Sequence, residues 1–509
     1  METKTAAIEM RNITKRFGPV LANDKVWLNI YRGEILALLG ENGSGKTTLM
    51  NMLSGIYFPD EGEIKIDGKE VVIRSPKDAF DNGIGMIHQH FKLVDVLTAA
   101  ENIVLGLPGK LDLKAASAKI REICDKYGFS VDPAQKIYDM SVSQKQTVEI
   151  VKVLYRGADI LILDEPTAVL TPQETDKLFA VLRNMRNDGK AIVIITHKMH
   201  EVEALSDRVA ILRHGQFIGD MLTAHTNAQE MTNMMVGHAV SLNIERPDPV
   251  DPKPRIEVKG LTVRSVDGIV KLDDVSFTAN SGEILGIAGI SGCGQKELLE
   301  AIAGLQTVES GSISYIEDDG SREELIGKDP LSIAELGVSL SFVPEDRLGM
   351  GLVGNMNLAD NMMLRSFRRG KSIFTDRRSP RALAESVVQE LSVSTPSVDT
   401  PVRRLSGGNV QKVLVGREIA SAPTVLLTAY AVRGLDIHSS YTIYDLINRQ
   451  KKAGVAVIFV GEDLDVLLEL CDRILVLCVG KVSGIVSGRG AEKREVGMMM
   501  TKLGGQSHE

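Results

Sequence analysis

The sequence lacks any long hydrophobic run. Its longest apolar stretches, at 191–195, 455–460 and 474–479, are five or six residues long, whereas a membrane-spanning helix needs about 20. The N-terminal segment carries acidic residues and lacks the apolar core of a signal peptide. We therefore expect the chain to stay in the cytoplasm, so that any role at a membrane would depend on partner chains.

Cysteine and positive charge are also scarce. The chain has four cysteines, and no two of them form a Cys-x-x-Cys pair, which argues against structural zinc and indicates buried thiols in a reducing compartment. Lys and Arg number 59 against 67 Asp and Glu, for a formal net charge of −8. Because nucleic-acid-binding proteins usually show a basic balance, the composition disfavours that class.

The chain contains an internal repeat. RGEILALLGENGSGKTTL, from Arg32, is matched by SGEILGIAGISGCGQKEL, from Ser281, and a later pair of matching segments begins at Ser141 and Ser406. Between the copies lies SLNIERPDPVDPKP, whose four prolines favour an extended linker. The 509 residues are enough for two domains of about 250 each. We predict a first domain at 1–240, a linker at 241–254 and a second domain at 255–509.

Each copy alternates short Val, Ile and Leu runs with helical stretches. This is the pattern of strands that are buried on both faces of a mostly parallel sheet. The opening segments, at 8–30 and 256–279, instead alternate apolar and polar residues, which predicts an antiparallel layer beside the main sheet. The sequence therefore predicts an α/β fold in each half.

Residues 40–47, GENGSGKT, fit the P-loop pattern between an apolar strand and the start of a helix. In such a loop glycines let backbone N–H groups face phosphates, Lys46 neutralises phosphate charge and Thr47 can coordinate Mg²⁺. The strand–loop–helix context disfavours a glycine-rich turn that binds nothing, so we expect ATP and Mg²⁺ here. The predicted ATP-binding residues of this segment are Gly40, Glu41, Asn42, Gly43, Ser44, Gly45, Lys46, Thr47 and Thr48.

Two further strand ends carry groups suited to hydrolysis. The apolar strand 160–163 ends in Asp164 and Glu165, placed to hold Mg²⁺ through water and to polarise the attacking water, respectively. Strand 191–195 is followed by Thr196 and His197. Because ligands gather at the carboxyl ends of parallel strands, we expect His197 to sense the γ-phosphate. The predicted catalytic residues are thus Lys46, Glu165 and His197.

These motifs, in this order, resemble those of the ATP-binding-cassette (ABC) family. The resemblance implies two tandem P-loop (RecA-like) nucleotide-binding domains, each with an antiparallel β layer and a helical subdomain. It also implies that Phe17, in KRFG, stacks on adenine. Gln89, in MIHQH, corresponds to the Q-loop glutamine that joins Mg²⁺ to the membrane-subunit interface. The predicted metal-binding residues are Thr47, Gln89 and Asp164.

The second copy lacks most of the catalytic side chains. Its matched positions hold Gln295 for Lys46, Lys296 for Thr47, Ala429 for Asp164, Tyr430 for Glu165, Glu462 for His197 and Glu345 for Gln89. The loss of the carboxylate that orients water alone removes roughly 10²–10⁴ in rate. We therefore expect negligible hydrolysis in the second half.

The signature loops show the opposite pattern. Residues 405–409, LSGGN, form an intact signature, whereas the first half has MSVSQ at 140–144 and Thr171 in place of the D-loop aspartate. In the family, two cassettes close head to tail, so that each P-loop is completed by the other cassette's signature. The resemblance therefore implies one composite site. To it the second half would contribute Ser406, Gly407, Gly408, Asn409 and Asp436.

The degraded GxxGxGQ loop, PEDR, RLSGGNxQK and LDEPTAVLTPQE resemble the ATP-binding subunits of simple-sugar and nucleoside importers, and HQHFKLV favours the nucleoside branch. The resemblance implies two permease subunits, an extracytoplasmic solute-binding (lipo)protein and a place at the cytoplasmic face of the inner membrane. A soluble twin-cassette ATPase acting on ribosomes or DNA is the alternative. The short proline-rich linker, the single sound site and the acidic charge disfavour it.

Overall fold

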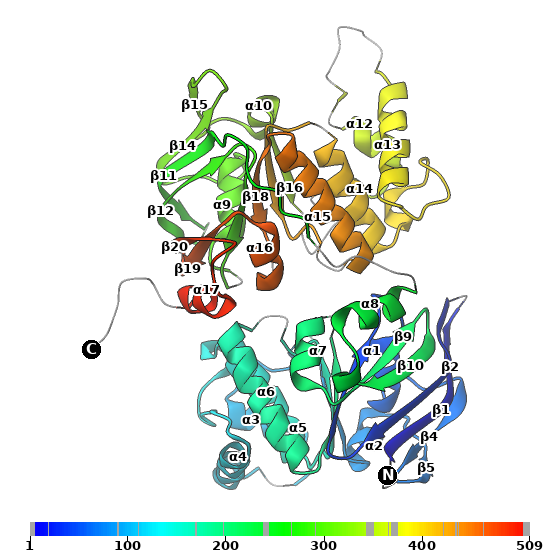
Figure 1. Ribbon diagram of the computed structural model, residues 1–509. Helices are drawn as coiled ribbons and strands as arrows, with labels where there is room; N and C mark the ends of the chain where they lie inside the picture. The colour runs from blue at the N-terminus through cyan, green and yellow to red at the C-terminus, as the bar shows by residue number, and fades with distance from the viewer. Residues whose placement is uncertain are drawn as a thin grey trace. The chain divides into compact units, whose positions relative to one another are not determined.

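The computed structural model forms two compact units, Met1–Ser241 and Leu242–Glu509. Figure 1 colours the chain from blue at the N-terminus to red at the C-terminus. The structure describes residues 6–501 except 19, 89–90, 110, 168–169, 197, 238–243, 266, 291, 343–350, 365, 368–374, 421, 433–434, 436 and 462.

A six-stranded sheet lies at the centre of the first unit. Its strand order is β10-β9-β3-β8-β7-β6, and all neighbours are parallel except β10 and β9. Every residue of β3, β6 and β8 is buried, as expected for Ile-, Leu- and Val-rich strands covered on both faces. The strands are β3 (Glu34–Leu39), β6 (Ile84–Ile87), β7 (Ile160–Asp164), β8 (Ala191–Ile195), β9 (Arg208–Arg213) and β10 (Gln216–Leu222).

An antiparallel sheet forms a second layer, with the order β2-β1-β4-β5. In β2 the buried residues Val26, Leu28 and Ile30 alternate with exposed ones, and β1 also buries apolar side chains. Both strands pack with α1 (Lys46–Leu53) and the central sheet in one apolar cluster. The predicted antiparallel layer is therefore confirmed. Its strands are β1 (Ala6–Phe17), β2 (Val20–Tyr31), β4 (Glu61–Ile66) and β5 (Lys69–Val71).

Helices α3, α4 and α5 form a helical subdomain of the first unit (Figure 1). They have an apolar core of their own, which includes Ile103, Ile120 and Val148. Helix α6 covers the central sheet through Leu178, Leu182 and neighbouring apolar residues. The helices are α2 (Pro76–Asp81), α3 (Ala99–Val104), α4 (Leu113–Tyr127), α5 (Val142–Tyr155), α6 (Pro172–Asn187), α7 (Met199–Leu205) and α8 (Ala228–Val236), with 3₁₀ turns η1 (Ile137–Asp139) and η2 (Thr223–His225).

The second unit repeats both sheets in the same spatial order, β16-β17-β18-β13-β19-β20 and β12-β11-β14-β15. This repetition confirms the predicted α/β fold of two tandem domains. Its strands are β11 (Pro254–Arg264), β12 (Val270–Asn280), β13 (Ile284–Ala288), β14 (Ser310–Ile316), β15 (Arg322–Glu324), β16 (Val338–Phe342), β17 (Val425–Ala429), β18 (Ala456–Val460), β19 (Arg473–Cys478) and β20 (Lys481–Ser487). Its helices are α9 (Gln295–Ile302), α10 (Pro330–Glu335), α12 (Leu358–Met363), α13 (Arg378–Glu390), α14 (Gly407–Ile419), α15 (Ile437–Lys452), α16 (Leu464–Leu470) and α17 (Lys493–Met499), with the 3₁₀ turn η3 (Val402–Arg404).

The described part of the proline-rich segment, residues 244–253, packs against the rest of the second unit. The Arg246 guanidinium donates to the carbonyl oxygens of Leu468 and Cys471, both at 2.7 Å. The Lys451 ammonium donates to the carbonyl of Pro247. These bonds hold the segment to α16 and to the end of α15. Among the helices described, none combines the length and the apolar character that crossing a bilayer requires.

Candidate ATP site

The loop at residues 40–47 connects β3 to α1, and two of its glycines are required by their surroundings. A Cβ at Gly40 would lie 2.2 Å from the carbonyl oxygen of Leu212, and one at Gly45 would lie 2.3 Å from that of Ala22. Gly45 also has a left-handed backbone, with φ of 96°. Only glycine fits here because any side chain would clash with backbone atoms. A tight loop that opens directly into a helix is the geometry that binds phosphates.

The tip of this loop is exposed to solvent, whereas its base is buried. Residues 42–43 are exposed, whereas Ser44 is buried and Thr48, in the first turn of α1, is half-buried. The Ser44 N–H donates to the Glu41 carbonyl, and the Ser44 carbonyl accepts from the Gly215 N–H, both at 3.1 Å. The first bond closes the loop on itself, and the second ties its base to the turn between β9 and β10.

The Lys46 side chain is buried within the loop, with 9% of its surface exposed. Its ammonium donates to the carbonyl oxygens of Gly40 at 2.7 Å and Glu41 at 2.9 Å. Burial lowers the pKa of Lys46, and the nearby carboxylates of Glu165 and Asp164 oppose that shift. Carbonyl dipoles are weaker partners than full negative charges, so triphosphate oxygens would be stronger acceptors for this buried cation.

Asp164 and Thr47 approach each other at the end of β7. The Thr47 hydroxyl donates to a carboxylate oxygen of Asp164 at 3.4 Å. Burial and the neighbouring Glu165 raise the pKa of Asp164 to about 6, against the weaker effects of Thr47 and Lys46. A hydroxyl and a carboxylate are hard oxygen ligands of the kind that Mg²⁺ takes together with nucleotide phosphates. These residues therefore fit a Mg²⁺–nucleotide complex.

The protein itself offers no complete metal cage in the described part of the chain. There, no group of three or more His, Cys, Asp or Glu side chains is arranged to hold a metal ion. Mg²⁺ commonly takes one or two protein ligands and completes its shell with water and phosphate oxygens.

Glu165 follows Asp164 in a sharp, left-handed turn, with φ of 47°. Its N–H donates to the Ile195 carbonyl at 2.9 Å, which joins the ends of β7 and β8. In the second unit Tyr430 has φ of 54° and donates to the Val460 carbonyl at 3.0 Å. Such a backbone is strained for residues other than glycine. Both units therefore share this turn as part of their common fold. They differ in the side chain that the turn carries, which is a carboxylate in the first unit and a phenol in the second.

The P-loop of the second unit keeps its shape but loses its cation. Gly294 precedes α9 with φ of 101°, as Gly45 precedes α1. Gln295 takes the place of Lys46, is 4% exposed, and donates through its amide to the Ile290 carbonyl at 3.1 Å. An uncharged amide at this position cannot neutralise a triphosphate.

Phe17 lies on the surface with an aromatic neighbour that the sequence analysis missed. Phe17 is 41% exposed and Tyr57 37% exposed, and their ring centroids lie 5.1 Å apart, edge to face. The Lys15 ammonium lies 5.6 Å from the Phe17 ring. Exposed aromatic rings are suited to stacking on a nucleobase. An aromatic shortly after the P-loop helix could have flagged Tyr57 as a second candidate.

The LSGGN segment of the second unit caps α14. The Ser406 hydroxyl accepts from the Asn409 backbone N–H at 3.5 Å and from its side-chain amide at 2.8 Å. A Cβ added at Gly408 would meet only Leu435, at an ordinary contact distance of 3.4 Å. Packing within this unit therefore does not demand glycine at 408.

Several predicted residues lie outside the described part of the chain. They are Gln89, His197 and Asp436 among the predicted site residues, and Glu345 and Glu462 among their matched positions. Within the first unit the structure brings together Lys46, Thr47, Asp164 and Glu165.

The fold and the site define a tandem pair of P-loop nucleotide-binding domains. The ABC transporter family model matches residues 23–168 and 272–428, which is more than half of the chain, so the chain belongs to the ABC transporter family. It is an ATP-binding protein and an ATPase of that family.

Similar proteins match almost the whole chain. The nucleoside import ATP-binding protein NupA of Lactococcus lactis is 42% identical, over 99% of this chain and 99% of its own. The guanosine import ATP-binding protein NupO of Bacillus subtilis is 40% identical, over 97% of each chain. The glucose import ATP-binding protein TsgD13 of Haloferax volcanii is 39% identical, over 98% of this chain and 96% of its own.

One solved structure with a similar fold is the archaeal ribosome recycling factor aABCE1, in complex with the ribosomal stalk protein aP1. It has a TM-score of 0.60 and covers 91% of this chain and 87% of its own, at 16% identity. At this low identity the likeness shows the fold alone.

Proposed function

We propose that this chain is the ATP-hydrolysing subunit of a membrane importer for a small solute. The observation that carries the proposal is the contrast between the two units on one backbone. The first presents Lys46, Asp164 and Glu165 around its P-loop, and the second presents Gln295 and Tyr430 at matched positions. The similar proteins at 39–42% identity are import ATP-binding proteins, which supports import as the process that hydrolysis drives.

In the proposed site, Lys46 neutralises phosphate charge and Thr47 and Asp164 hold Mg²⁺. Glu165 orients the attacking water. Gln89 would share the metal ion and His197 would contact the γ-phosphate. Phe17 would stack on the adenine ring, with Tyr57 supporting it from the side.

The second unit is proposed to complete this site through its signature loop. Ser406, Gly407, Gly408 and Asn409 would face the nucleotide held by the first unit, and Asp436 would complete the D-loop. The unhindered Cβ position at Gly408 supports this role, because close approach by phosphate is a reason for glycine where local packing supplies none.

The proposed solute is a nucleoside, with a simple sugar or another ribose-bearing solute as the next candidate. Nucleoside, guanosine and glucose import are the printed roles of the similar proteins. Two permease subunits and an extracytoplasmic solute-binding (lipo)protein are the proposed partners. The chain would then sit at the cytoplasmic face of the inner membrane, attached through the permeases.

A reconstituted transporter tests the proposal. The chain, its permeases and its binding protein are placed in vesicles loaded with ATP, and uptake of radiolabelled guanosine, ribose and glucose is compared. We expect ATP-dependent uptake of the nucleoside. Preferential uptake of ribose or glucose would instead identify a simple sugar as the solute. Failure to bind any permease, together with co-purification with ribosomes, would contradict an importer.

A further inference from the structure

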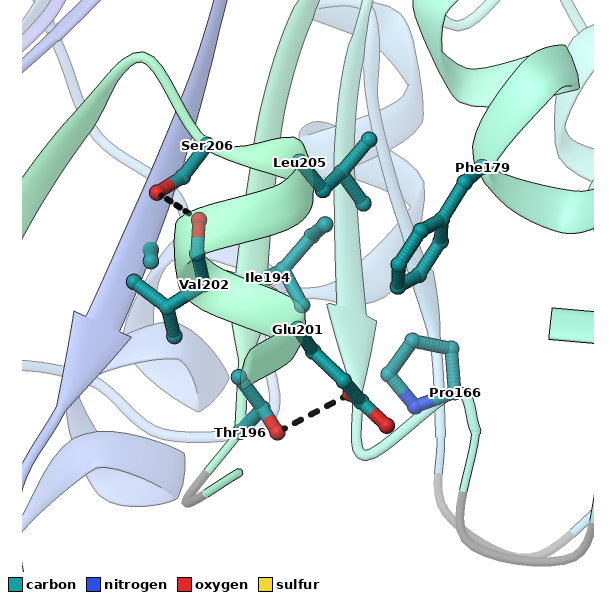
Figure 2. Close-up of a pocket in the computed structure, with 9 residues that line it drawn as sticks. Pro166, Phe179, Ile194, Thr196, Glu201, Val202, Leu205 and Ser206 are labelled. Atoms are coloured by element: carbon teal, nitrogen blue, oxygen red, sulfur yellow. Dashed lines mark hydrogen bonds between the residues drawn. The ribbon is translucent and has the colours of Figure 1, made fainter. Parts of the chain in front are cut away.

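A buried carboxylate, Glu201, lies beside the ends of β7 and β8. It is 4% exposed, and it accepts hydrogen bonds from the hydroxyls of Thr167 at 2.5 Å and Thr196 at 3.2 Å. The Lys198 ammonium lies 3.1 Å from the same carboxylate. Figure 2 shows Glu201 bonded to Thr196. Both residues line a cavity of about 10 Å³. We refer to Thr167, Thr196, Lys198 and Glu201 as the Glu201 cluster.

The cluster joins the two chain segments that carry the hydrolytic groups. Thr167 follows Glu165 by two residues, and Thr196 directly precedes His197 in the chain. Lys198 adds a third link, because its ammonium donates to the Thr167 carbonyl at 3.3 Å. The Glu165 N–H to Ile195 carbonyl bond connects the same two segments nearer the sheet. One carboxylate thus fixes the distance between both strand ends beyond the last bond of the sheet.

The second unit shows what the fold does without this cluster. At the matched positions it has Val432, Gly461, Asp463 and Val466. Helix α16 (Leu464–Leu470) nevertheless corresponds to α7 (Met199–Leu205) residue for residue, and the Tyr430 N–H still donates to the Val460 carbonyl. The helix and the strand ends therefore form without the carboxylate. In this chain the cluster is present only in the unit that keeps Lys46 and Glu165.

The energetics of burying charged groups also indicate that the Glu201 cluster has a role beyond stabilising the fold. A buried ion pair is often no more stabilising than well-packed apolar residues of similar volume, because both charges lose their hydration. A valine at the matched position of the second unit is such an apolar alternative. Retention of a fully bonded carboxylate in the first unit therefore needs a reason other than stability of the fold.

We propose that Glu201 is a positioning residue for ATP hydrolysis. Its carboxylate holds Thr167, after β7, and Thr196, after β8, at a fixed separation, so that Glu165 keeps the geometry needed for attack by water. This inference rests on the proposed function of Glu165. A displacement of about 1 Å in a reacting group can cost roughly 10²-fold in rate, so loss of the cluster is expected to lower kcat and leave ATP binding intact.

The test uses the full chain assembled with its permeases, and it compares kcat, KM for ATP and the thermal midpoint. Glu201→Val copies the matched residue of the second unit and is expected to lower kcat by about 10–100-fold. KM should stay within about twofold, as expected when an interaction acts mainly on the chemical step. The midpoint should fall, because the Thr167 and Thr196 hydroxyls lose their acceptor. Thr167→Val replaces the hydroxyl with a methyl group at nearly constant volume, and it should lower kcat by about tenfold with the same KM. Ser206→Ala is the matched control, because Ser206 lines the same cavity but donates to the Val202 carbonyl.

Retention of normal kcat in Glu201→Val would overturn the inference. So would a parallel loss of kcat, ATP affinity and thermal midpoint, because that pattern marks a purely structural role. If Glu201→Val does not fold, Thr167→Val decides alone, and unchanged turnover in it overturns the inference. Turnover that persists in Glu165→Gln would overturn the proposed function, whereas turnover lost in Glu165→Gln but kept in both cluster variants overturns this inference only.

Discussion

Glu165 and Tyr430 occupy the same left-handed turn in the two halves of the chain, with φ of 47° and 54°. The backbone cost of such a turn, roughly 1–3 kcal/mol, is therefore borne in both units. Chemistry at the residue scale depends on what the turn presents: a carboxylate beside Asp164 in one unit, a phenol in the other. The same holds for Lys46 and Gln295, which begin equivalent helices.

We predict that Glu165→Gln lowers the rate of ATP hydrolysis by roughly 10²–10⁴-fold, because an amide cannot accept the proton of the attacking water. Tyr430→Phe changes the matched turn of the second unit and should leave the rate within about twofold, since no catalytic group is lost there. Steady-state phosphate release from the assembled transporter measures both. Equal losses in the two variants would contradict a single working site.

We predict that Asp164→Asn stabilises the nucleotide-free protein at neutral pH while removing activity. Burial and the charge of Glu165 raise the pKa of Asp164 from its ordinary value of 3.8 to about 6. The folded state therefore favours the neutral acid, and this contribution to stability is complete below about pH 4 and lost as pH rises through 6. Asparagine stays neutral, so the gain at pH 7.5 should be roughly 1–3 kcal/mol.

Thermal unfolding of this variant in EDTA, at pH 4.5 and pH 7.5, measures the effect. The difference from the wild type should be large at pH 7.5 and should shrink at pH 4.5. Asp159→Asn, at a carboxylate side chain that is 59% exposed in its ion pair with Lys190, is the control and should change the stability at pH 7.5 by less than about 1 kcal/mol. A gain of equal size at both pH values would contradict the assignment to Asp164.

At the scale of elements, helices α5 and α14 begin with equivalent serine caps in the two units. Ser141 and Gln144 form a complete capping box at α5, and Ser406 accepts from the Asn409 N–H at α14. The caps are alike, but the residues behind them differ: a serine at 143 and a glycine at 408. Capping explains why both serines suit a helix start, and it does not explain the glycine.

We predict that Ser406→Arg lowers ATP hydrolysis at least tenfold, whereas Ser141→Arg leaves it within about twofold. Each change removes a helix cap, so both should destabilise the protein by a similar amount, about 1 kcal/mol. Only the loop at Ser406 is proposed to face the nucleotide, where a bulky side chain would block close approach. Phosphate release and thermal unfolding, measured on the same samples, separate the two effects. A loss of activity in Ser141→Arg would contradict the single composite site.

At the scale of the whole molecule, one fold is present twice and the proline-rich segment belongs to its second copy. Within that copy Lys451 forms an ion pair with Asp472 at 2.6 Å, and both side chains are nearly buried. The same ammonium donates to the Pro247 carbonyl. The proline-rich segment is thus bound to the rest of the second unit through the buried Lys451 ammonium, and it does not act as a free linker.

We predict that Lys451→Met destabilises the second unit by about 3–5 kcal/mol, because it leaves the buried Asp472 carboxylate without its counter-ion. Lys452→Met is the matched control: its side chain is 54% exposed, its ammonium lies 3.7 Å from the Glu245 carboxylate, and the change should cost less than about 1 kcal/mol. Urea unfolding followed by circular dichroism measures both. Equal stability of the two variants would show that the segment is not anchored through Lys451.

The sequence alone determined the duplication, the α/β class of each half and the side chains around the first P-loop. These follow from local patterns: apolar strand runs, a glycine-rich loop before a helix, and carboxylates at a strand end. The sequence also determined that the second copy has no lysine at the position matched to Lys46 and no carboxylate at the position matched to Glu165, because matched motifs can be compared position by position.

Only the tertiary structure decided which distant residues meet. The pairing of Phe17 with Tyr57, the bond from the Thr167 hydroxyl to Glu201, and the anchoring of Arg246 on α16 each join separate elements. No periodicity or motif encodes such contacts. They arise because packing two sheets and their helices brings together side chains that lie tens or hundreds of residues apart in the chain.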